Sequence, residues 1–251
     1  MSRSAIITGA AAGIGADIAR ALAAEGYRVG LIDRDAGPLA ETAGAIAGAL
    51  ALPADVTDEA AIAAAFDSFG DTFDAAPDLV VLNAGIVRFG PLAEQSVADF
   101  RLVIEINLVG AYITAREAVR RMAPAGRGHV IGITSTNAYS PGPGSGAYPA
   151  SKSGLRQLLK QFALEYGGQG LRFNSIAPGF IDGGMSTPIY ADPKVRAARS
   201  GGVPLGRLGT PQDIANAVVM LDDPRSSYIT GVDLLVDGGV SHAVLKNLPR
   251  E

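Results

Sequence analysis

The chain has 251 residues, 48% of them hydrophobic, and its formal net charge of −4 without a long basic run argues against nucleic acid as the main partner. The absence of cysteine excludes disulfides and thiolate chemistry, and two histidines leave too few ligands for a catalytic zinc site, so we expect no metal. No stretch reaches the roughly 18 apolar residues of a membrane span, and a strand pattern at Ser4 leaves no room for a signal peptide. We therefore expect a cytoplasmic protein without a membrane partner.

Strand and helix patterns alternate from one end of the chain to the other. Short apolar runs predict strands at Ser4–Thr8, Tyr27–Ile32, Leu50–Pro53, Leu79–Leu82, His129–Thr134, Arg172–Ile176 and Val232–Val236. Longer Ala-rich or amphipathic stretches predict helices at Ile14–Glu25, about Pro38–Gly48, Glu59–Phe69, Val97–Met122, Tyr148–Tyr166 and Pro211–Leu221.

This alternation is typical of βαβ units, in which strands form one parallel sheet covered by helices on both faces. It predicts a single α/β domain over residues 1–251, a Rossmann-type doubly wound parallel sheet of about seven strands. An irregular segment from about Asp182 to Leu208 follows a strand end and is interrupted by Gly, Pro and Ser. Because ligands of such sheets bind beyond the carboxyl ends of the strands, we expect this segment to form a substrate lid. An ordinary surface excursion is the alternative.

A glycine-rich run, Thr8-Gly9-Ala10-Ala11-Ala12-Gly13-Ile14-Gly15, lies between the first strand and the first helix. Glycines there let the backbone turn sharply and approach a pyrophosphate at the helix N-terminus. Asp33 ends the second strand, where a carboxylate accepts hydrogen bonds from the adenosine ribose and repels a 2′-phosphate. The pattern favours NAD over NADP, although the neighbouring Arg34 could bind a 2′-phosphate.

Tyr148 and Lys152 are four residues apart at the start of a predicted helix, so they share a face if Pro149 occupies the first turn. A phenol has a pKa near ~10, and a cation held beside it lowers that value. We expect Lys152 to make Tyr148 a proton donor and acceptor near neutral pH. A surface lysine beside a half-buried core tyrosine is the alternative.

Together, the glycine run and the Tyr148-x-x-x-Lys152 pair resemble the short-chain dehydrogenase/reductase family over essentially the whole chain. Leu82-Asn83-Ala84-Gly85 resembles the Asn-Ala-Gly segment that steadies the sheet and lines the adenine side, and Asp55-Val56 resembles the pair against the adenine ring. Asn107 matches a helix asparagine whose backbone carbonyl holds a water of the proton relay, and Ser135 matches the serine that orients the substrate. The C-terminal runs Tyr228–Gly231 and Val236–Gly239 resemble the closing signature of the family.

The resemblance implies an oxidoreductase that interconverts a secondary alcohol and a ketone, with Asn107, Ser135, Tyr148 and Lys152 as catalytic residues. Tyr148 would exchange a proton with the substrate oxygen, Ser135 would orient that oxygen, and Lys152 would hold the nicotinamide ribose. The implied cofactor contacts are Gly9, Gly13, Ile14, Gly15, Asp33, Asp55, Val56, Asn83, Gly85, Tyr148, Lys152, Pro178, Gly179 and Ile181. The turn at Pro178, Gly179 and Ile181 would touch the nicotinamide.

Several alternatives stay open. Asn83-Ala84-Gly85-Ile86-Val87-Arg88 resembles the ketoacyl carrier reductases of this family. This alternative would make the protein a 3-ketoacyl-(carrier protein or CoA) reductase, with NADP as an alternative cofactor. Yet Phe89 rather than an acid follows, and no basic docking patch is evident. A non-catalytic NAD-binding regulator would lack a catalytic residue, and longer epimerases or dehydratases carry C-terminal sequence absent here. Many relatives have Thr after the Pro-Gly turn, whereas this chain reads Ile181-Asp182-Gly183-Gly184-Met185.

Two further expectations concern assembly and substrate. Family members are commonly tetramers that use the helices corresponding to about 98–122 and 148–166, so the resemblance implies a homotetramer. Ser140–Gly146 would flank the pocket for a small-molecule alcohol or ketone, whose identity the sequence does not specify.

Overall fold

The fold is described from a computed structural model over residues 3–244. The strands are β1 (Ser4–Thr8), β2 (Arg28–Asp33), β3 (Leu50–Pro53), β4 (Leu79–Leu82), β5 (Gly128–Ile133), β6 (Leu171–Pro178) and β7 (Asp233–Val236). The α-helices are α1 (Gly13–Ala24), α2 (Ala36–Gly44), α3 (Glu59–Phe73), α4 (Val97–Ile104), α5 (Gly110–Met122), α6 (Tyr148–Tyr166), α7 (Thr187–Tyr190), α8 (Pro193–Gly202) and α9 (Pro211–Asp222).

All seven strands join one parallel sheet in the order β3-β2-β1-β4-β5-β6-β7. The predicted fold class, a Rossmann-type doubly wound sheet, is therefore confirmed. The order reverses between β1 and β4, so the chain leaves these two neighbours in opposite directions. Such a switch point opens a crevice beyond the carboxyl ends of the strands, where ligands of doubly wound sheets bind.

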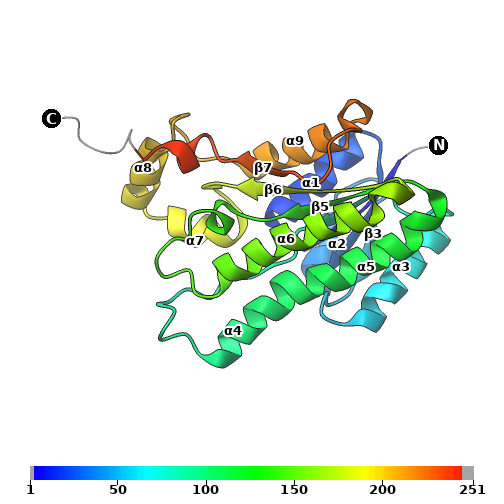
Figure 1. Cartoon of the computed structure of the whole chain (residues 1–251), viewed down its shortest axis with the longest axis horizontal. Coiled ribbons are helices and arrows are strands. Elements are labelled where there is room, and N and C mark those ends of the chain that lie inside the picture. The colour runs from blue at the N-terminus through cyan, green and yellow to red at the C-terminus, as the bar shows by residue number, and fades with distance from the viewer. Residues whose placement is uncertain (1–2, 245–251) are drawn as a thin grey trace.

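Helices cover both faces of the sheet (Figure 1). Successive strand residues point to opposite faces, so Ile6 packs with α3, α5 and α6, whereas Ile7 packs with α1, α2 and α9. Both residues are fully buried. Because each face is covered, the strands are continuous apolar runs rather than alternating ones. None of the helices within residues 3–244 combines the length and the apolar character needed to cross a membrane.

The main differences from the predicted elements concern two segments. The helix expected over Val97–Met122 is divided into α4 and α5 by a π-helical turn at Glu105–Val109. The segment from 182 to 208 is not irregular throughout, because it contains α7 and α8. An N-cap starts α8, since the Asp192 carboxylate accepts a hydrogen bond from Lys194 N at 2.8 Å and Pro193 occupies the first turn. Other element ends differ by a few residues.

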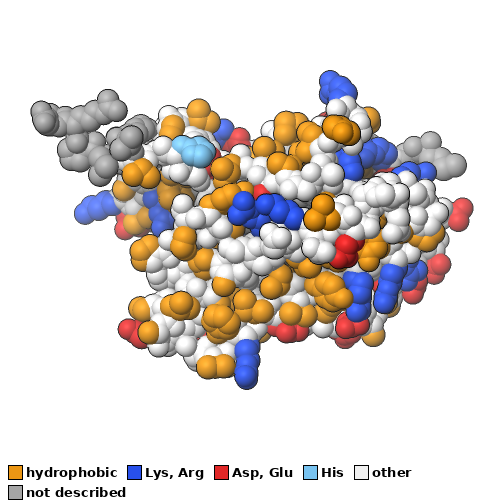
Figure 2. Space-filling view, in the orientation of Figure 1, with side chains coloured by type: hydrophobic (Ala, Val, Ile, Leu, Met, Phe, Trp, Pro, Cys, Tyr) orange, Lys and Arg blue, Asp and Glu red, His pale blue; other side chains and the backbone are white. Residues whose placement is uncertain are grey.

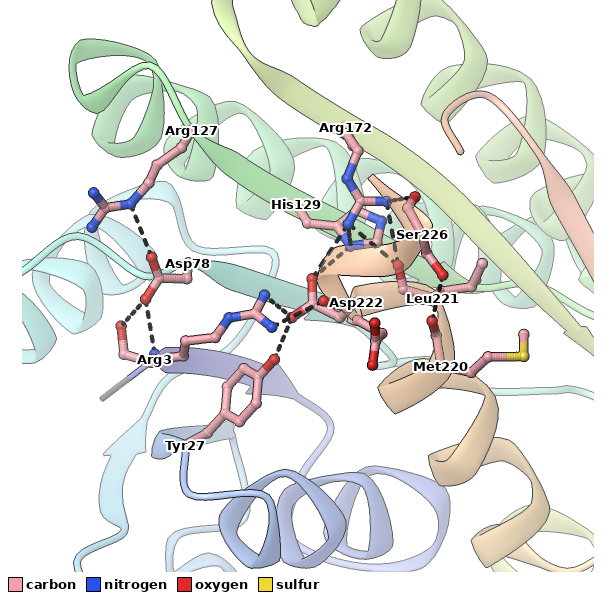
Figure 3. A network of polar contacts seen from close by, with 12 residues as sticks. Arg3, Tyr27, Asp78, Arg127, His129, Arg172, Met220, Leu221, Asp222 and Ser226 are labelled. Atoms are coloured by element: carbon pink, nitrogen blue, oxygen red, sulfur yellow. Dashed lines mark hydrogen bonds and ion pairs between the residues drawn. The ribbon is translucent and has the colours of Figure 1, made fainter. Parts of the chain in front are cut away.

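A polar cluster closes the edge of the sheet where the strands begin (Figure 3). Asp222, the last residue of α9, is buried and receives hydrogen bonds from Arg3, Tyr27 Oη (2.7 Å) and His129 Nδ1 (2.8 Å). Arg172 lies 3.6 Å from the same carboxylate. An acidic group at a helix C-terminus is unfavourable for the helix dipole, and the two arginines offset that effect. The cluster ties α9 to the starts of β1, β2, β5 and β6.

Candidate active site

A cavity of about 1050 Å³ lies beyond the carboxyl ends of the strands and spans the switch point. Every predicted site residue lines it except Gly15 and Asn107, which lie directly behind its wall. Ser140, Gly142, Pro143 and Ser145 also line it, as expected for the loop that precedes α6. The structure thus brings residues from the whole length of the chain to one chamber.

The glycine-rich turn after β1 forms one wall of this cavity. Gly9 and Gly13 have φ values of +66° and +58°, a left-handed conformation that side chains disfavour. A Cβ on Gly15 would lie only 2.2 Å from Gly9 O, so this glycine allows the turn to pack on α1 rather than lining the cavity. Asn83 donates from Nδ2 to Thr8 O (3.1 Å) and Gly9 O (3.0 Å), which holds the turn against the end of β4.

Helix α1 begins directly after this turn and has no side-chain cap, because its N-cap residue is Ala12. By contrast, Asp58 caps α3 and Thr210 caps α9. The first backbone N–H groups of α1 therefore lack a side-chain acceptor, and Gly13 and Ile14 line the cavity. Uncapped N–H groups beside a glycine turn suit a pyrophosphate, so the residues present fit a dinucleotide.

Asp33 lies at the end of β2, where backbone groups hold its carboxylate. Ala11 N donates to Oδ2 and Asp35 N donates to Oδ1, both at 3.1 Å. Arg34 is exposed and lies 3.8 Å from Asp35, and it also helps lower the pKa of Asp55. Hydrogen bonding from the Thr57 backbone is the larger cause of that lowered pKa. The charge of Arg34 is thus shared between two carboxylates at this end of the cavity.

Tyr148 and Lys152 lie on the first turns of α6, with Pro149 in the first turn as expected. The Lys152 ammonium lies 5.6 Å from the centre of the Tyr148 ring and donates to Ile133 O at 2.8 Å. Ser135, just past β5, is nearly buried and its Oγ accepts a hydrogen bond from Asn137 N at 3.1 Å. A phenol, an ammonium and a hydroxyl therefore meet where β5 ends.

The pKa values of these groups differ from the expectation. Burial raises the pKa of Tyr148, and hydrogen bonding to the Ser135 side chain lowers it only in part. Burial also lowers the pKa of Lys152 from 10.5 to about 8. In the protein without a cofactor the pKa of Tyr148 is thus raised rather than lowered, because removal from water has the larger effect. Further positive charge would be needed to favour the phenolate.

Asn107 lies in the π-helical turn between α4 and α5 and is fully buried. Its Oδ1 accepts from Ile86 N at 2.8 Å, while its Nδ2 donates to Ile86 O (2.9 Å) and Ser151 Oγ (3.0 Å). A Cβ on Gly85 would lie 3.2 Å from Asn107 Oδ1 and 3.4 Å from Lys152 Nζ. Asn107 thereby connects the segment after β4 to α6, immediately behind Lys152. π-helical turns of this kind occur frequently at functional sites.

The opposite wall comes from the end of β6 and from the segment that carries α7 and α8. Gly179 N donates to Val236 O, and Ile181 pairs with Gly209 in an isolated bridge. A Cβ on Gly13 would lie 3.0 Å from Gly184 Cα, so the 182–208 segment reaches the glycine-rich turn. Figure 1 shows α7 and α8 together at the end of the sheet away from the N-terminus. This segment forms the wall where a lid was expected.

Several lining residues had no individual role in the sequence prediction, and three of them lie in contact with one another. They are Phe180, Tyr190 and Arg199. The Arg199 guanidinium stacks 4.8 Å from the Phe180 ring centre and 5.7 Å from that of Tyr190. An Asp192-Pro193 pair is a helix-start signal that could have located α8. Nothing in the sequence, however, indicates that the Arg199 side chain lines the cavity.

Together, a doubly wound parallel sheet, a glycine-rich turn and a cavity at the switch point define a Rossmann-type α/β protein. A family model described as enoyl-(acyl carrier protein) reductase matches residues 9–241. The chain belongs to the short-chain dehydrogenase/reductase family, a family of oxidoreductases.

Known proteins resemble the chain over nearly its full length. It is 37% identical to cis-4-hydroxycyclohexanecarboxylate dehydrogenase of Sinomonas cyclohexanicum, over 94% of this chain and 96% of the relative. Levodione reductase superposes with a TM-score of 0.91 at 31% identity, covering 96% of this chain and 98% of that one. The 3-ketoacyl-(acyl-carrier-protein) reductase of Brucella melitensis, crystallised with NADH, gives a TM-score of 0.89 at 31% identity, covering 95% and 98%.

Proposed function

We propose that the protein is an NAD-dependent oxidoreductase that interconverts a secondary alcohol and a ketone, with Tyr148 as general acid and base. The observation that carries the proposal is that Ser135, Tyr148 and Lys152 face the same cavity as the glycine-rich turn and Asp33. A proton donor and a dinucleotide site share one chamber, as hydride transfer to or from a carbonyl carbon requires. Both dehydrogenases and reductases occur among the similar proteins.

Residues of this chain would hold a nicotinamide dinucleotide in two places. The uncapped start of α1 with Gly9 and Gly13 would hold the pyrophosphate. Asp33, fixed by two backbone N–H groups, would accept from the ribose hydroxyls and repel a 2′-phosphate. Because Asp35 lies 3.8 Å from Arg34, the charge of Arg34 is partly balanced and less available to a 2′-phosphate. This arrangement supports NAD over NADP.

The reacting carbonyl or hydroxyl would lie between Ser135 and Tyr148. When bound, the cofactor supplies or accepts the hydride. The raised pKa of Tyr148 keeps its phenol protonated at neutral pH, which suits proton donation to a ketone oxygen. Ser135 would hold that oxygen with its hydroxyl. In the oxidative direction the phenol must lose its proton, and the ammonium of Lys152 lies where it stabilises the phenolate.

A ketoacyl thioester is the second candidate substrate, favoured by the similarity to the Brucella melitensis reductase. It would require a docking surface for an acidic carrier protein. Arg88, between the lining residues Val87 and Phe89, is paired with Asp99 at 3.7 Å. A small alcohol or ketone therefore has the better support, and a non-catalytic regulator has the least because the four candidate catalytic residues are all in place.

The test is the Tyr148→Phe variant, assayed by NADH absorbance against a panel of secondary alcohols, polyols, sugars and hydroxy acids. Loss of the phenolic proton should lower kcat by about 10²- to 10⁴-fold while NADH still binds in a fluorescence titration. Tyr166→Phe, at the far end of the same helix, is the matched control and should keep wild-type turnover. Turnover of Tyr148→Phe close to that of the control would refute the proposal.

A homotetramer and a cytoplasmic location also stay proposals. Large apolar side chains are exposed on the helices expected at the interfaces: Phe100 on α4 (39%), Tyr112 on α5 (40%) and Leu164 on α6 (81%). Figure 2 shows hydrophobic side chains spread across this face of the molecule. Burial of these side chains between copies would stabilise a tetramer. Light scattering on the purified protein would give its mass directly.

A further inference from the structure

One cation in the cavity has no carboxylate partner among the described residues and no role in the proposed proton transfer. Arg199, on α8, lines the cavity, yet among residues 3–244 no carboxylate pairs with it. The other two arginines of the 182–208 segment are paired, Arg196 with Asp182 at 2.6 Å and Arg207 with Asp213 at 2.7 Å. The arginine that faces the cavity is therefore the one that its own segment leaves without a counter-charge.

Aromatic side chains hold the Arg199 guanidinium in place. It stacks on Phe180, which follows the Pro178-Gly179 turn, and on Tyr190, which is buried at the end of α7. Its Nη1 is 3.4 Å from Tyr190 Oη, a long contact with a neutral group. Stacking fixes the plane of a guanidinium and leaves its N–H edges available to a planar anion. Because these side chains are already ordered, binding an anion costs little side-chain entropy.

The charges that line the cavity are divided between its two ends. Asp33, Arg34, Asp35 and Asp55 lie where the adenosine is expected, beyond β2 and β3. Within the described part of the chain, Arg199 and Lys152 are the charged residues lining the other end. Lys152 donates to Ile133 O beside Tyr148, which leaves Arg199 as the cation directed at the rest of the substrate.

The remaining wall at this end combines polar side chains, among them Thr136, Asn137, Ser140 and Ser145, with a group of apolar ones. Val87 and Phe89 line it from a segment that Gly90 N joins to Gly144 O at 2.8 Å, next to the start of α6. Met185 and Ile189 line it from the segment that carries Tyr190. Phe89 and Met185 are 65% and 49% exposed, so their apolar surface is open to a ligand. A hydrocarbon body with an anionic end complements this wall.

We infer that the substrate is a hydroxy acid or its oxo-acid product, in which a hydrocarbon spacer separates the carboxylate bound by Arg199 from the alcohol carbon at Tyr148. This inference rests on the proposed alcohol–ketone chemistry. A carboxylate is preferred because it accepts two parallel hydrogen bonds from a guanidinium. Arg199 binds and orients the substrate and takes no part in the proton transfer.

The experiment compares ring and open-chain hydroxy acids with their own primary amides, which keep the shape and remove the charge. Wild-type kcat/KM for the best acid should exceed that for its amide by at least about tenfold. Arg199→Met, which keeps an apolar side chain against Phe180, should lower kcat/KM for the acid by about 10- to 100-fold, mainly through KM. The amide should change by less than about threefold.

Lys194→Met removes an exposed cation from the same helix and should leave the acid-to-amide ratio as in the wild type. Three results would overturn the inference. In Arg199→Met, kcat/KM could fall equally for acid and amide, or the affinity for NADH could be weaker than in the wild type. In the wild type, neutral alcohols could be turned over while no acid is. If no alcohol is turned over, the proposed function fails, and calorimetry still decides the inference. In the presence of NADH, cyclohexanecarboxylate should bind the wild type at least about tenfold more tightly than Arg199→Met, and equal affinities would overturn it.

Discussion

At the amino ends of the strands Asp222 is buried among Arg3, Tyr27, His129 and Arg172, whereas at the carboxyl ends Lys152 is buried with a single backbone carbonyl as acceptor. Both sites lie on the same sheet, at opposite ends of the same strands. We call the two ends of the sheet the amino edge and the carboxyl edge. At the amino ends the buried carboxylate lies among cationic and hydrogen-bonding partners, whereas the carboxyl ends leave cations and uncapped N–H groups directed at a cavity.

The difference reflects what each edge does. A buried charge that is fully paired contributes to a single packed arrangement, while an unpaired one is costly to the folded state. Sites that bind ligands keep such unpaired groups because the ligand supplies the missing partner, so they trade stability for function. The amino edge should therefore stabilise the fold, and the carboxyl edge should weaken it.

The largest expected effect on stability is at Asp222. Asp222→Ala would leave Arg172, His129 and Tyr27 without their shared acceptor, and we expect the free energy of unfolding to fall by about 3–5 kcal/mol. Denaturant unfolding at fixed protein concentration measures the change. Asp223→Ala is the matched control, because its partner Arg225 is almost fully exposed. Similar unfolding curves for the two variants would show that the amino edge is not the anchor that its contacts suggest.

Replacement of Lys152 should change the free energy of unfolding in the opposite direction to replacement of Asp222. Burial lowers its pKa from 10.5 to about 8, so folding disfavours the ammonium and the full penalty is present at pH 7, below both values. We expect Lys152→Met to raise the free energy of unfolding at pH 7 by about 1–3 kcal/mol, while turnover falls at least about 100-fold. The gain should shrink as the pH rises from about 8 to 10.5. Lys160→Met on the same helix is the control, and a loss of stability in Lys152→Met would contradict the argument.

The sequence predicted the architecture well where local pattern and tertiary environment agree. The bounds of β1, β3, β4 and α6 are those expected, because short buried strands and a long helix with Pro in its first turn have strong signals. Helix α8 was missed because its Gly and Ser residues resemble a loop. The π-helical turn at Asn107 was also missed, since it depends on contacts with Ile86 and Ser151 from elsewhere in the chain.

The site divides in the same way. Spacing alone suggested the Tyr148–Lys152 pair, because four residues on a helix share a face. Spacing could not give the direction of the Tyr148 pKa, which depends on burial by segments distant in sequence. Nor could it single out Arg199, whose significance comes from its stacking on Phe180 and from the pairing of Arg196 and Arg207 elsewhere.

A smaller effect on the free energy of unfolding should appear at the amino edge as the pH is lowered. Asn174 Nδ2 lies 2.9 Å from His129 Nε2, and the Asn174 amide is fixed because its Oδ1 accepts from Val232 N. The ring nitrogen facing Asn174 is therefore an acceptor, His129 is neutral, and burial lowers its pKa. Since the unfolded chain takes up this proton below about pH 6.5, stability should fall by up to about 1.4 kcal/mol per pH unit as the pH decreases.

Comparison of the wild type with His129→Gln between about pH 6.5 and 5 isolates that slope, which the variant should lose. His242→Gln removes the other histidine of the chain, which is exposed, and should keep the wild-type slope. Equal slopes in all three proteins would mean that protonation of His129 does not destabilise the folded protein.

The smallest expected effect on stability is at Asp33. This residue tests the carboxyl edge at the end of the cavity where the adenosine is expected. Asp33→Ser removes a charge whose partners are two backbone N–H groups, so the free energy of unfolding should change by less than about 1 kcal/mol. The ratio of kcat/KM for NADP to that for NAD should rise by about 10- to 100-fold, because the Asp33 carboxylate no longer repels a 2′-phosphate. Glu41→Gln removes an exposed carboxylate of α2 and is the control, which should leave the ratio close to that of the wild type. If instead the wild type already prefers NADP, the carboxylate of Asp33 does not select the cofactor, and Arg34 dominates this end of the cavity despite Asp35 and Asp55.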